Sequence, residues 1–242
     1  DGQRLLQVGA SRQIAVSDSG RDIFQSIRTG NGTFSLAAAS ANTGTGVIGS
    51  GSVLDPTSWT GNNYQIQFTS PTSYTVTNTT TAAVIGSYTY ASNTEITAVP
   101  GISFSIQGAP AAGDSFTVAP STDQSIFTTL QNLISAFSTN ISGNATAGAA
   151  VRNTINAEMK NLDRTLENVS TVQASIGSRR SELSSLTNVS EALELHYKER
   201  ISDLQDIDYA EVISAFSQQQ MQLEAAQSSF AKISGLSLFN YL

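Results

Sequence analysis

Apolar and polar residues alternate along five short stretches in the first half of the chain. A period of two with one apolar face is typical of half-buried β-strands. Breakers such as "TSPTS", "VPG" and "GAPAAGD" lie between the stretches and predict turns. The low-complexity segment "SANTGTGVIGSGS" predicts a loop or an irregular edge. The predicted strands cover residues 64–68, 74–78, 95–99, 102–106 and 115–119.

The first 28 residues predict a β-hairpin and a turn. The segments "RLLQVG" and "RQIAVS" contain strand-forming residues, and a short polar link joins them as in a hairpin. The following "DSGRDIFQSI" favours a turn that leads into a short helix.

The apolar period changes to that of a helix after Ser121. A longer helical pattern begins near Ala145, and its apolar residues recur every seven positions. Such a repeat over many turns is a coiled-coil signal. The first helix should have one apolar face made of Ile126, Leu130, Leu133, Ile134 and Phe137. The seven-residue series of the longer helix consists of Ile155, Leu162, Val169, Ile176 and Leu183.

The stretch "DIDYAEV" predicts that a new helix starts, or that the helix kinks, near residue 208. Asp208 and Glu211 stand as N-cap and N3 residues of a capping box, and Ile207 can form a hydrophobic staple. The next helix has its own apolar stripe, and the chain then ends in an apolar tail. We expect this stripe and tail to make subunit-assembly contacts through Val212, Ile213, Phe216, Leu223, Phe230, Ile233, Leu236, Leu238, Phe239 and Leu242.

Four glutamines dilute this stripe: Gln218, Gln219, Gln220 and Gln222. On a buried face of a coiled coil, glutamine side chains could pair across chains and fix the register. On an exposed face they would simply be solvated. The sequence leaves both interpretations open.

Together these patterns predict a multidomain α+β chain with a long coiled-coil-like helix, a β-hairpin, an inserted all-β sandwich or barrel and a terminal amphipathic helix. A helix of roughly sixty residues cannot bury its own apolar stripe, so other helices must cover it. We therefore expect residues 209–242 to be poorly ordered in a lone molecule. The predicted division is 1–28 for the hairpin and turn, 29–121 for the β domain, 122–208 for the long-helix domain and 209–242 for the assembly helix.

Charged residues make up only 13% of the chain, about half the usual share. Residues 29–113 contain two of them, whereas residues 151–211 contain 18. The net charge of −7 argues against binding to nucleic acid or to an anionic membrane surface. The apolar runs are all shorter than the ~18 to 20 residues of a membrane-spanning helix.

The sequence offers no catalytic, cofactor or metal site, so we predict that the chain is not an enzyme. Cysteine is absent, which excludes disulfides and thiol chemistry. His196 lies in the long helix without a positioned catalytic partner, which favours a solvated or packed side chain. Asp203, Asp206 and Asp208 lack the glycine and glutamate of a calcium loop.

The C-terminal text "DLQDIDYAEVISAFSQQQMQLEAAQSSFAKISGLSLFNYL" resembles the C-terminal signature of the flagellin superfamily. Its ending, "ISGLSLFNYL", is most similar to the hook–filament junction family, the third hook-associated proteins of the FlgL type. Upstream, "LLQVGASRQIAVSDSGRDIF" and "GISFSIQGAPAAGDSFTV" are similar to segments of hook-associated proteins. Members of the family begin with long N-terminal helices, which are not in this sequence. We therefore expect this chain to be a fragment of a longer protein.

The resemblance implies a structural axial component of the bacterial flagellum that joins the hook to the filament by coiled-coil packing of subunits. It implies an extracellular location at the hook–filament junction, reached by type III export without a cleaved signal peptide. The implied partners are other copies of the chain in a ring or tube, the first hook-associated protein, flagellin and an export chaperone. The alternatives are a filament subunit of the flagellin type and a surface adhesin with a coiled stalk.

Overall fold

The structure is a computed structural model that describes residues 2–9, 11–205 and 208–235. The chain forms two compact units, 1–181 and 182–242. The first contains every strand together with α1, α2 and most of α3, and the second contains the end of α3 and α4. The predicted α+β class is confirmed, whereas the four-part division of the chain remains a prediction. The helices are α1 (Gly20–Phe24), α2 (Ile126–Phe137), α3 (Ala145–Gln205) and α4 (Tyr209–Gly235).

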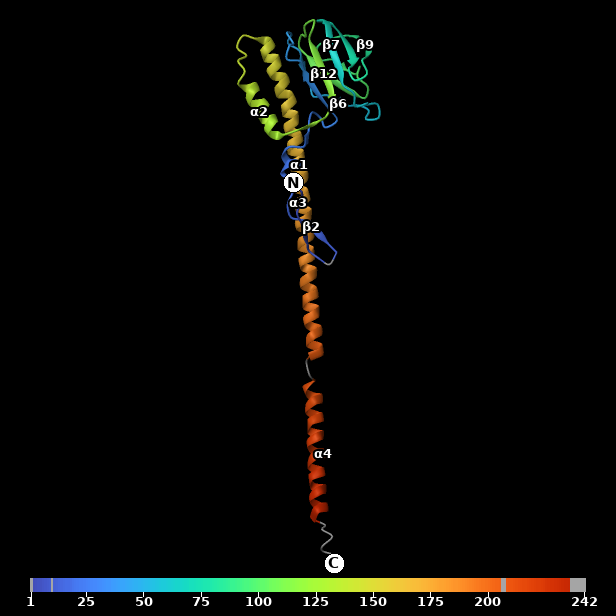
Figure 1. The fold of residues 1–242 in the computed structure, drawn as a ribbon, viewed down its shortest axis with the longest axis vertical. Helices are drawn as coiled ribbons and strands as arrows, with labels where there is room; N and C mark the ends of the chain where they lie inside the picture. Colours follow the sequence, from blue (N-terminus) through green and yellow to red (C-terminus); the bar gives the residue numbers. More distant parts are fainter. Residues whose placement is uncertain (1, 10, 206–207, 236–242) are drawn as a thin grey trace, which may run out of the picture. The chain divides into compact units, whose positions relative to one another are not determined.

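A five-stranded antiparallel sheet forms one layer of the β region (Figure 1). Its strand order is β4-β12-β7-β8-β9, so β4 and β9 are its edges. Along β7 and β8 every second residue is buried, as the alternating sequence predicts. The strands are β4 (Phe34–Ala38), β7 (Tyr64–Ser70), β8 (Ser73–Asn78), β9 (Ala83–Thr89) and β12 (Ser115–Pro120).

A second, smaller sheet is built around one long strand, β11 (Ile102–Gln107). Its neighbours have two residues each, and two of them lie in or at the end of the segment predicted as a loop or irregular edge. Ser103 of β11 is 3% exposed, so this strand is buried on both faces near its start, which simple alternation does not predict. The short strands are β5 (Val47–Ile48), β6 (Ser52–Val53) and β10 (Glu95–Ile96).

Three of the five predicted strands match β7, β8 and β11, and the fifth matches β12. The remaining prediction, 95–99, is too long, because only its first two residues pair as β10. Two strands of the five-stranded sheet have no counterpart among the predicted stretches. β4 ends in small residues, and β9 is exposed along its whole length as an edge strand, so neither shows a strong apolar alternation.

The core of the β region is apolar and rich in aromatic rings. The ring of Phe68 lies 5.1 Å from that of Tyr90 and 5.9 Å from that of Phe116. Trp59, the only tryptophan of the chain, packs against Phe34 at 5.7 Å between ring centres. Trp59 fluorescence therefore reports on this core. The buried cluster comprises Phe34, Leu36, Ile48, Tyr64, Ile66, Phe68, Tyr74, Val76, Ile96, Val99, Ile102, Phe104, Ile106, Phe116 and Val118.

The two connections between the β region and the helices are paired with each other. β3 (Ile27–Arg28) leads into the β region, β13 (Asp123–Gln124) leads out, and the two strands pair antiparallel. The buried hydroxyl of Ser121 donates to the carbonyl of Thr29 at 2.7 Å, and the amide of Thr29 donates to the carbonyl of Thr122 at 2.9 Å. The β region is therefore an insertion whose entry and exit are held together.

The face of α3 that packs on the rest of unit 1 is polar. Asn153 accepts a hydrogen bond from the amide of Ile48 at 2.8 Å and donates to the carbonyl of Gly46 at 2.9 Å. Its side-chain amide thus pairs with β5 as a neighbouring strand would. Two turns later, Asn161 accepts from the amide of Gly30 at 2.8 Å.

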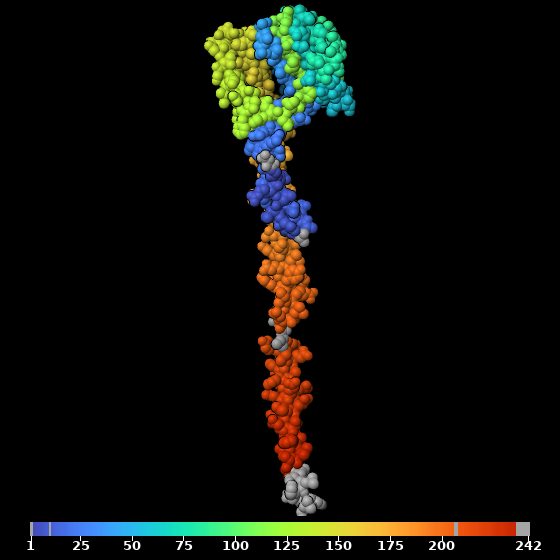
Figure 2. All heavy atoms as spheres, viewed as in Figure 1, coloured from blue at the N-terminus to red at the C-terminus, as the bar shows by residue number. Residues whose placement is uncertain are grey.

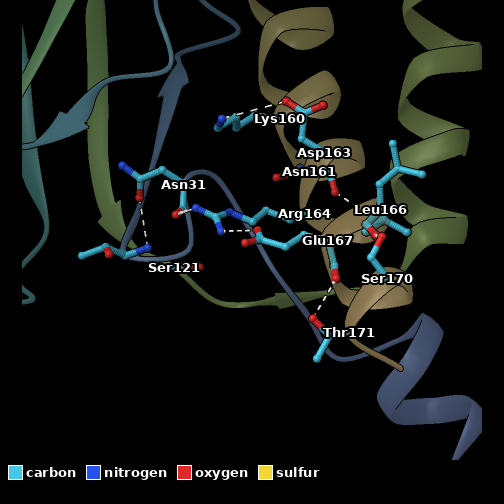
Figure 3. A network of polar contacts seen from close by, with 12 residues as sticks. Asn31, Ser121, Lys160, Asn161, Asp163, Arg164, Leu166, Glu167, Ser170 and Thr171 are labelled. Atoms are coloured by element: carbon cyan, nitrogen blue, oxygen red, sulfur yellow. Dashed lines mark hydrogen bonds and ion pairs between the residues drawn. The ribbon is translucent and has the colours of Figure 1, made fainter. Parts of the chain in front are cut away.

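These hydrogen bonds belong to a row of polar contacts along α3, from Asn153 to Arg179, which we call the polar seam. Figure 3 shows its middle part. Arg164 donates to the carbonyl of Asn31 and pairs with Glu167. Asn168 donates to the carbonyls of Asp22 and Ile23, in the short helix α1. The seam therefore holds both the β region and the segment before it on one face of the helix.

The seam ends at the predicted hairpin, β1 (Leu5–Gln7) and β2 (Gln13–Ala15), which pair antiparallel. Arg179 of α3 binds both carboxylate oxygens of Asp18, at 2.8 and 2.7 Å, and also donates to the carbonyl of Ala15. Both charged side chains are less than a fifth exposed, so this pair is better shielded from water than a surface ion pair.

The helix α2 lies beside the first turns of α3, on the side away from the β region (Figure 1). Ser125 caps it by accepting from the amide of Phe127 at 3.2 Å. Its buried residues are Thr129, Leu133 and Ala136. The predicted apolar face of α2 is only partly covered within the chain, because Leu133 is buried whereas Leu130, Ile134 and Phe137 are 42, 67 and 72% exposed.

Hydrogen bonds to Asp55 suggest a pH test of the β region. The hydroxyls of Ser58 and Thr57 donate to its carboxylate and lower its pKa from 3.8 to about 2. A pKa lowered by folding stabilises the protein above pH 4, and this stabilisation is lost as the pH falls through about 2. Urea unfolding followed by Trp59 fluorescence should therefore show wild type more stable than Asp55→Asn at pH 5, with the difference shrinking toward pH 2. A difference independent of pH would contradict this account.

The pairing of Asn153 with β5 predicts a second effect on stability. Asn153→Ala leaves the amide of Ile48 and the carbonyl of Gly46 without this partner, and each unpaired buried group costs about 1–3 kcal/mol. The free energy of unfolding, measured by Trp59 fluorescence in urea, should fall by at least that amount. Asn188→Ala, at an exposed position of α3, is the matched control and should change stability by less than about 0.5 kcal/mol. Equal effects of the two variants would show that the Asn153 contacts do not stabilise the β region.

Candidate assembly surface

The apolar stripe of α3 lies away from the polar seam. Met159 and Leu166 are 49 and 61% exposed, whereas Asn153 and Asn161 are 9 and 7% exposed. At 3.6 residues per turn, residues of one pair lie roughly 120–160° around the helix from those of the other. The residues that α3 buries within its own unit are small or polar: Ala149, Asn153, Glu158, Asn161 and Thr165.

The apolar residues that recur every seven positions also lie outside the buried polar face of α3. Ile155, Leu162 and Val169 are half-buried, and Ile176 and Leu183 are 42 and 38% exposed. None of the five is among the buried residues of α3. The coiled-coil interpretation of this series therefore remains a prediction that depends on helices outside the described contacts.

The part of α3 in the second unit also exposes large apolar side chains. Leu193, Tyr197 and Leu204 are 48, 62 and 86% exposed. Exposed apolar residues recurring along a helix mark a surface that binds another protein surface. The remaining exposed members are Val189, Leu195 and Ile201.

Asp208 forms the start of α4. Its carboxylate accepts from the amides of Ala210 at 2.9 Å and Glu211 at 3.3 Å, and its carbonyl accepts from the amide of Val212 at 3.0 Å. Glu211 lies in the first turn, where a negative charge interacts favourably with the helix dipole. Ile207, the predicted staple residue, lies outside the described residues.

The helix α4 has 27 residues and buries none of them. The six predicted assembly residues within it are exposed, from 48% for Val212 to 74% for Phe230. Four further predicted residues, in the apolar tail, lie outside the described residues: Leu236, Leu238, Phe239 and Leu242. The exposed six are Val212, Ile213, Phe216, Leu223, Phe230 and Ile233.

The four glutamines of α4 are exposed as well. Both interpretations of Gln218, Gln219, Gln220 and Gln222 therefore stay open, since an exposed side chain in one chain can be buried or solvated in an assembly. His196 and Asp203 are also exposed on α3. Within the part of the chain that the structure describes, no three or more His, Cys, Asp or Glu side chains group so that they could hold a metal ion. Over the same residues, no helix is long and apolar enough to cross a membrane.

Two exposed apolar surfaces were not predicted. On α2, Phe127 joins Leu130, Ile134 and Phe137 at positions i, i+3, i+7 and i+10, which places them along one side of the helix. The apolar spacing of these α2 residues is visible in the sequence, but it does not tell whether this side is covered within the same chain. On the hairpin, Leu5, Leu6 and Val16 are 60, 57 and 55% exposed.

Two family models match separate parts of the chain. The bacterial flagellin C-terminal helical region matches residues 159–242. The D2-like domain of flagellar hook-associated protein 1 matches residues 37–120. The first match covers most of α3 and all of α4, and the second covers most of the β region.

Curated relatives point in the same direction. Flagellar hook-associated protein 3 of Salmonella typhimurium is 33% identical over 117 residues, which are 48% of this chain and 37% of that protein. The protein of the same name from Escherichia coli is 34% identical over 117 residues. The chain spans 37% of the length of these curated relatives.

Solved structures match over more of the chain. The crystal structure of Xanthomonas campestris FlgL has 30% identity and a TM-score of 0.76, and the match covers 83% of this chain and 64% of that one. The flagellar hook-associated protein-3 of Legionella pneumophila has 26% identity and a TM-score of 0.77 over 85% of this chain and 66% of that one. In sequence and in fold, the chain is therefore similar to the FlgL-type hook-associated proteins, and its C-terminal part is similar to the bacterial flagellin C-terminal region.

Proposed function

We propose that this chain belongs to a structural, axial component of the bacterial flagellum that joins the hook to the filament. The observation that carries the proposal is α4, a helix of 27 residues without a buried side chain in a chain that matches FlgL-type proteins. One solved relative, from Legionella pneumophila, is itself described as a flagellar junction protein. The proposed role is mechanical and requires no catalysis.

The physical basis is the apolar surface that the chain leaves uncovered. Fully burying a leucine, isoleucine or phenylalanine side chain stabilises an assembly by roughly 1.5–3 kcal/mol. The six exposed residues of α4 could together offset the entropy lost when subunits are held in place. Residues 209–242 are the proposed assembly helix, and residues 29–121 are the proposed outer β domain, as the resemblance to the family implies. This position is compatible with the few charges and many hydroxyl groups of residues 29–121.

The proposed partners are other copies of the chain in a ring or tube, the first hook-associated protein on one edge and flagellin on the other. An export chaperone would hold the chain before assembly. The proposed location is extracellular, at the hook–filament junction, after type III export without a cleaved signal peptide. The zero cysteine content suits a chain exported unfolded.

A sedimentation experiment with the full-length gene product tests this role. The protein is mixed with isolated hooks that carry the first hook-associated protein and, separately, with flagellin filament seeds. Co-sedimentation with the hooks as a single saturable layer is expected. Unlimited growth on filament seeds would instead make the protein a filament subunit, and binding to neither would favour the adhesin alternative.

Substitutions within α4 test the proposed surface in the same assay. Leu223→Asp or Phe230→Asp would place an unpaired charge in the subunit interface, which costs several kcal/mol. We expect at least a hundredfold weaker binding to the hooks, with Trp59 fluorescence unchanged. Ser228→Asp introduces the same charge two residues before Phe230 but on the other side of α4, and this variant should bind nearly as wild type. If Leu223→Asp bound normally, the proposed surface would be wrong.

Hydrogen exchange tests whether assembly stabilises α4. Most of the stability of an amphipathic helix comes from packing, and α4 buries no residue of its own. In a dilute solution of the isolated chain, the amides of residues 209–235 should exchange much faster than those of β7 and β8. In the assembled layer they should become protected. Strong protection of α4 in the dilute monomer would contradict this expectation.

A further inference from the structure

Glu158 is a buried carboxylate on the polar face of α3. It is 7% exposed, although glutamate is rarely buried without a partner of opposite charge. Three side-chain amides donate to it: Asn132 at 2.6 Å, Asn161 at 2.8 Å and Gln124 at 2.9 Å. These donors come from α2, α3 and β13, so the structure builds a dedicated polar shell around one negative charge.

No lysine or arginine forms an ion pair with Glu158 among the described residues. The sequence has no lysine or arginine between Arg28 and Arg152. Three basic side chains at or beyond these limits pair with other carboxylates of the same unit. Arg28 pairs with Asp123 at 3.9 Å, Lys160 with Asp163 at 3.9 Å, and Arg164 with Glu167 at 2.6 Å. Amide donors stabilise a carboxylate, but they do not neutralise its charge.

Open space adjoins this carboxylate on two sides. One cavity of about 240 Å³ lies between α3 and strands β4 and β5, and a second of about 310 Å³ lies beside it. Glu158, Asn153 and Ala157 line both cavities. Figure 2 shows a hollow between the strands and helices on this face of unit 1. Each cavity is large enough for a small ligand or the end of a side chain.

The cavity wall still offers acceptors for hydrogen bonds. A carboxylate has about four lone-pair sites, of which three accept from the amides. Gln124, which lines the first cavity, donates from its amide nitrogen to Glu158 and Thr129, and its side-chain oxygen is a further acceptor. Hydroxyl groups of Thr29, Ser35, Ser50 and Thr122 also line this cavity. Lys160 lines it as well, with its ammonium 3.9 Å from a carboxylate oxygen of Asp163.

We propose that the first cavity binds a monovalent nitrogen cation, of the ammonium or guanidinium type, whose charge balances Glu158. A single carboxylate matches a single positive charge, and N–H donors match the acceptors of the wall. Divalent metals fit poorly, because they prefer several charged ligands and no acidic cluster of three occurs in the described residues. This site is separate from the assembly surface and does not rest on the proposed function.

The cation could be a free small amine or the end of a lysine side chain, since both present the same N–H donors. Side-chain amide signals of Gln124, Asn132 and Asn161 in nitrogen-15 NMR spectra of the 242-residue chain distinguish these sources. The probes are methylammonium and blocked lysine (N-acetyl-lysine methylamide). Potassium and tetramethylammonium, which have no N–H donor, are comparators at matched ionic strength.

Saturable shifts of these three signals at millimolar methylammonium or blocked lysine, without equal shifts from the comparators, are expected. A response to methylammonium alone would support a free amine, and a stronger response to blocked lysine would support a side chain. The absence of saturable shifts up to about 100 mM, or equal shifts with potassium and tetramethylammonium, would overturn the proposal.

Glu158→Gln removes the charge and should weaken binding at least tenfold, whereas Glu191→Gln, at an exposed position of α3, should not. Ala157→Leu keeps Glu158 but fills space in both cavities, and it should also abolish the shifts. Circular dichroism and Trp59 fluorescence check that each variant is folded, so that Ala157→Leu still tests the site if Glu158→Gln does not fold. Unchanged binding by a folded Glu158→Gln or Ala157→Leu variant would overturn the proposal.

Discussion

The arrangement of unit 1 depends on which face of α3 packs against the rest of the unit. This face is the polar one, not the apolar stripe. Asn153 and Asn161 reach backbone groups of the β region, and Arg179 reaches the hairpin. Apolar contacts tolerate sliding, whereas hydrogen bonds to backbone groups are directional, and a buried group that loses its partner costs about 1–3 kcal/mol. The seam therefore fixes the register of the chain along the helix. It also leaves the apolar stripe of α3 free for other helices.

The same seam explains how a nearly uncharged β region is held on a charged helix. The insertion enters and leaves through paired strands, so its two connections behave as one attachment. Asn153 adds a second attachment at β5 by completing the hydrogen bonding of a two-residue edge strand. An edge covered in this way is not available to pair with the strands of another molecule. Attachment at several points limits hinge motion between the β region and α3, which would suit the proposed structural role.

Two features of the chain are incomplete in isolation, and they differ in kind. The helix α4 exposes apolar side chains, and burial by another protein surface would stabilise it. Glu158 is buried already, and its three amide donors satisfy its hydrogen bonding but not its charge. An exposed apolar surface is stabilised when a large area of it is buried, whereas a buried charge is stabilised by one group of opposite charge. The first feature fits an assembly, and the second fits a small, specific occupant.

The sequence by itself determined the elements whose signals are local. Alternation placed β7, β8, β11 and β12, and helical periodicity placed α3 from Ala145 onward. The sequence did not predict the strands β4 and β9, because apolar and polar residues need not alternate in an edge strand or in a strand of small residues. The short strands β5 and β6 were not predicted because their pairing depends on contacts with β11.

Only the tertiary structure decided which face of each helix is covered. In α2 the buried side passes through Thr129 and Ala136, and in α3 it passes through Asn153 and Glu158. Periodicity identifies an apolar face, but it cannot tell whether that face meets the same chain or another one. The burial of Glu158 was equally invisible, because its three donors come from segments brought together only by the fold.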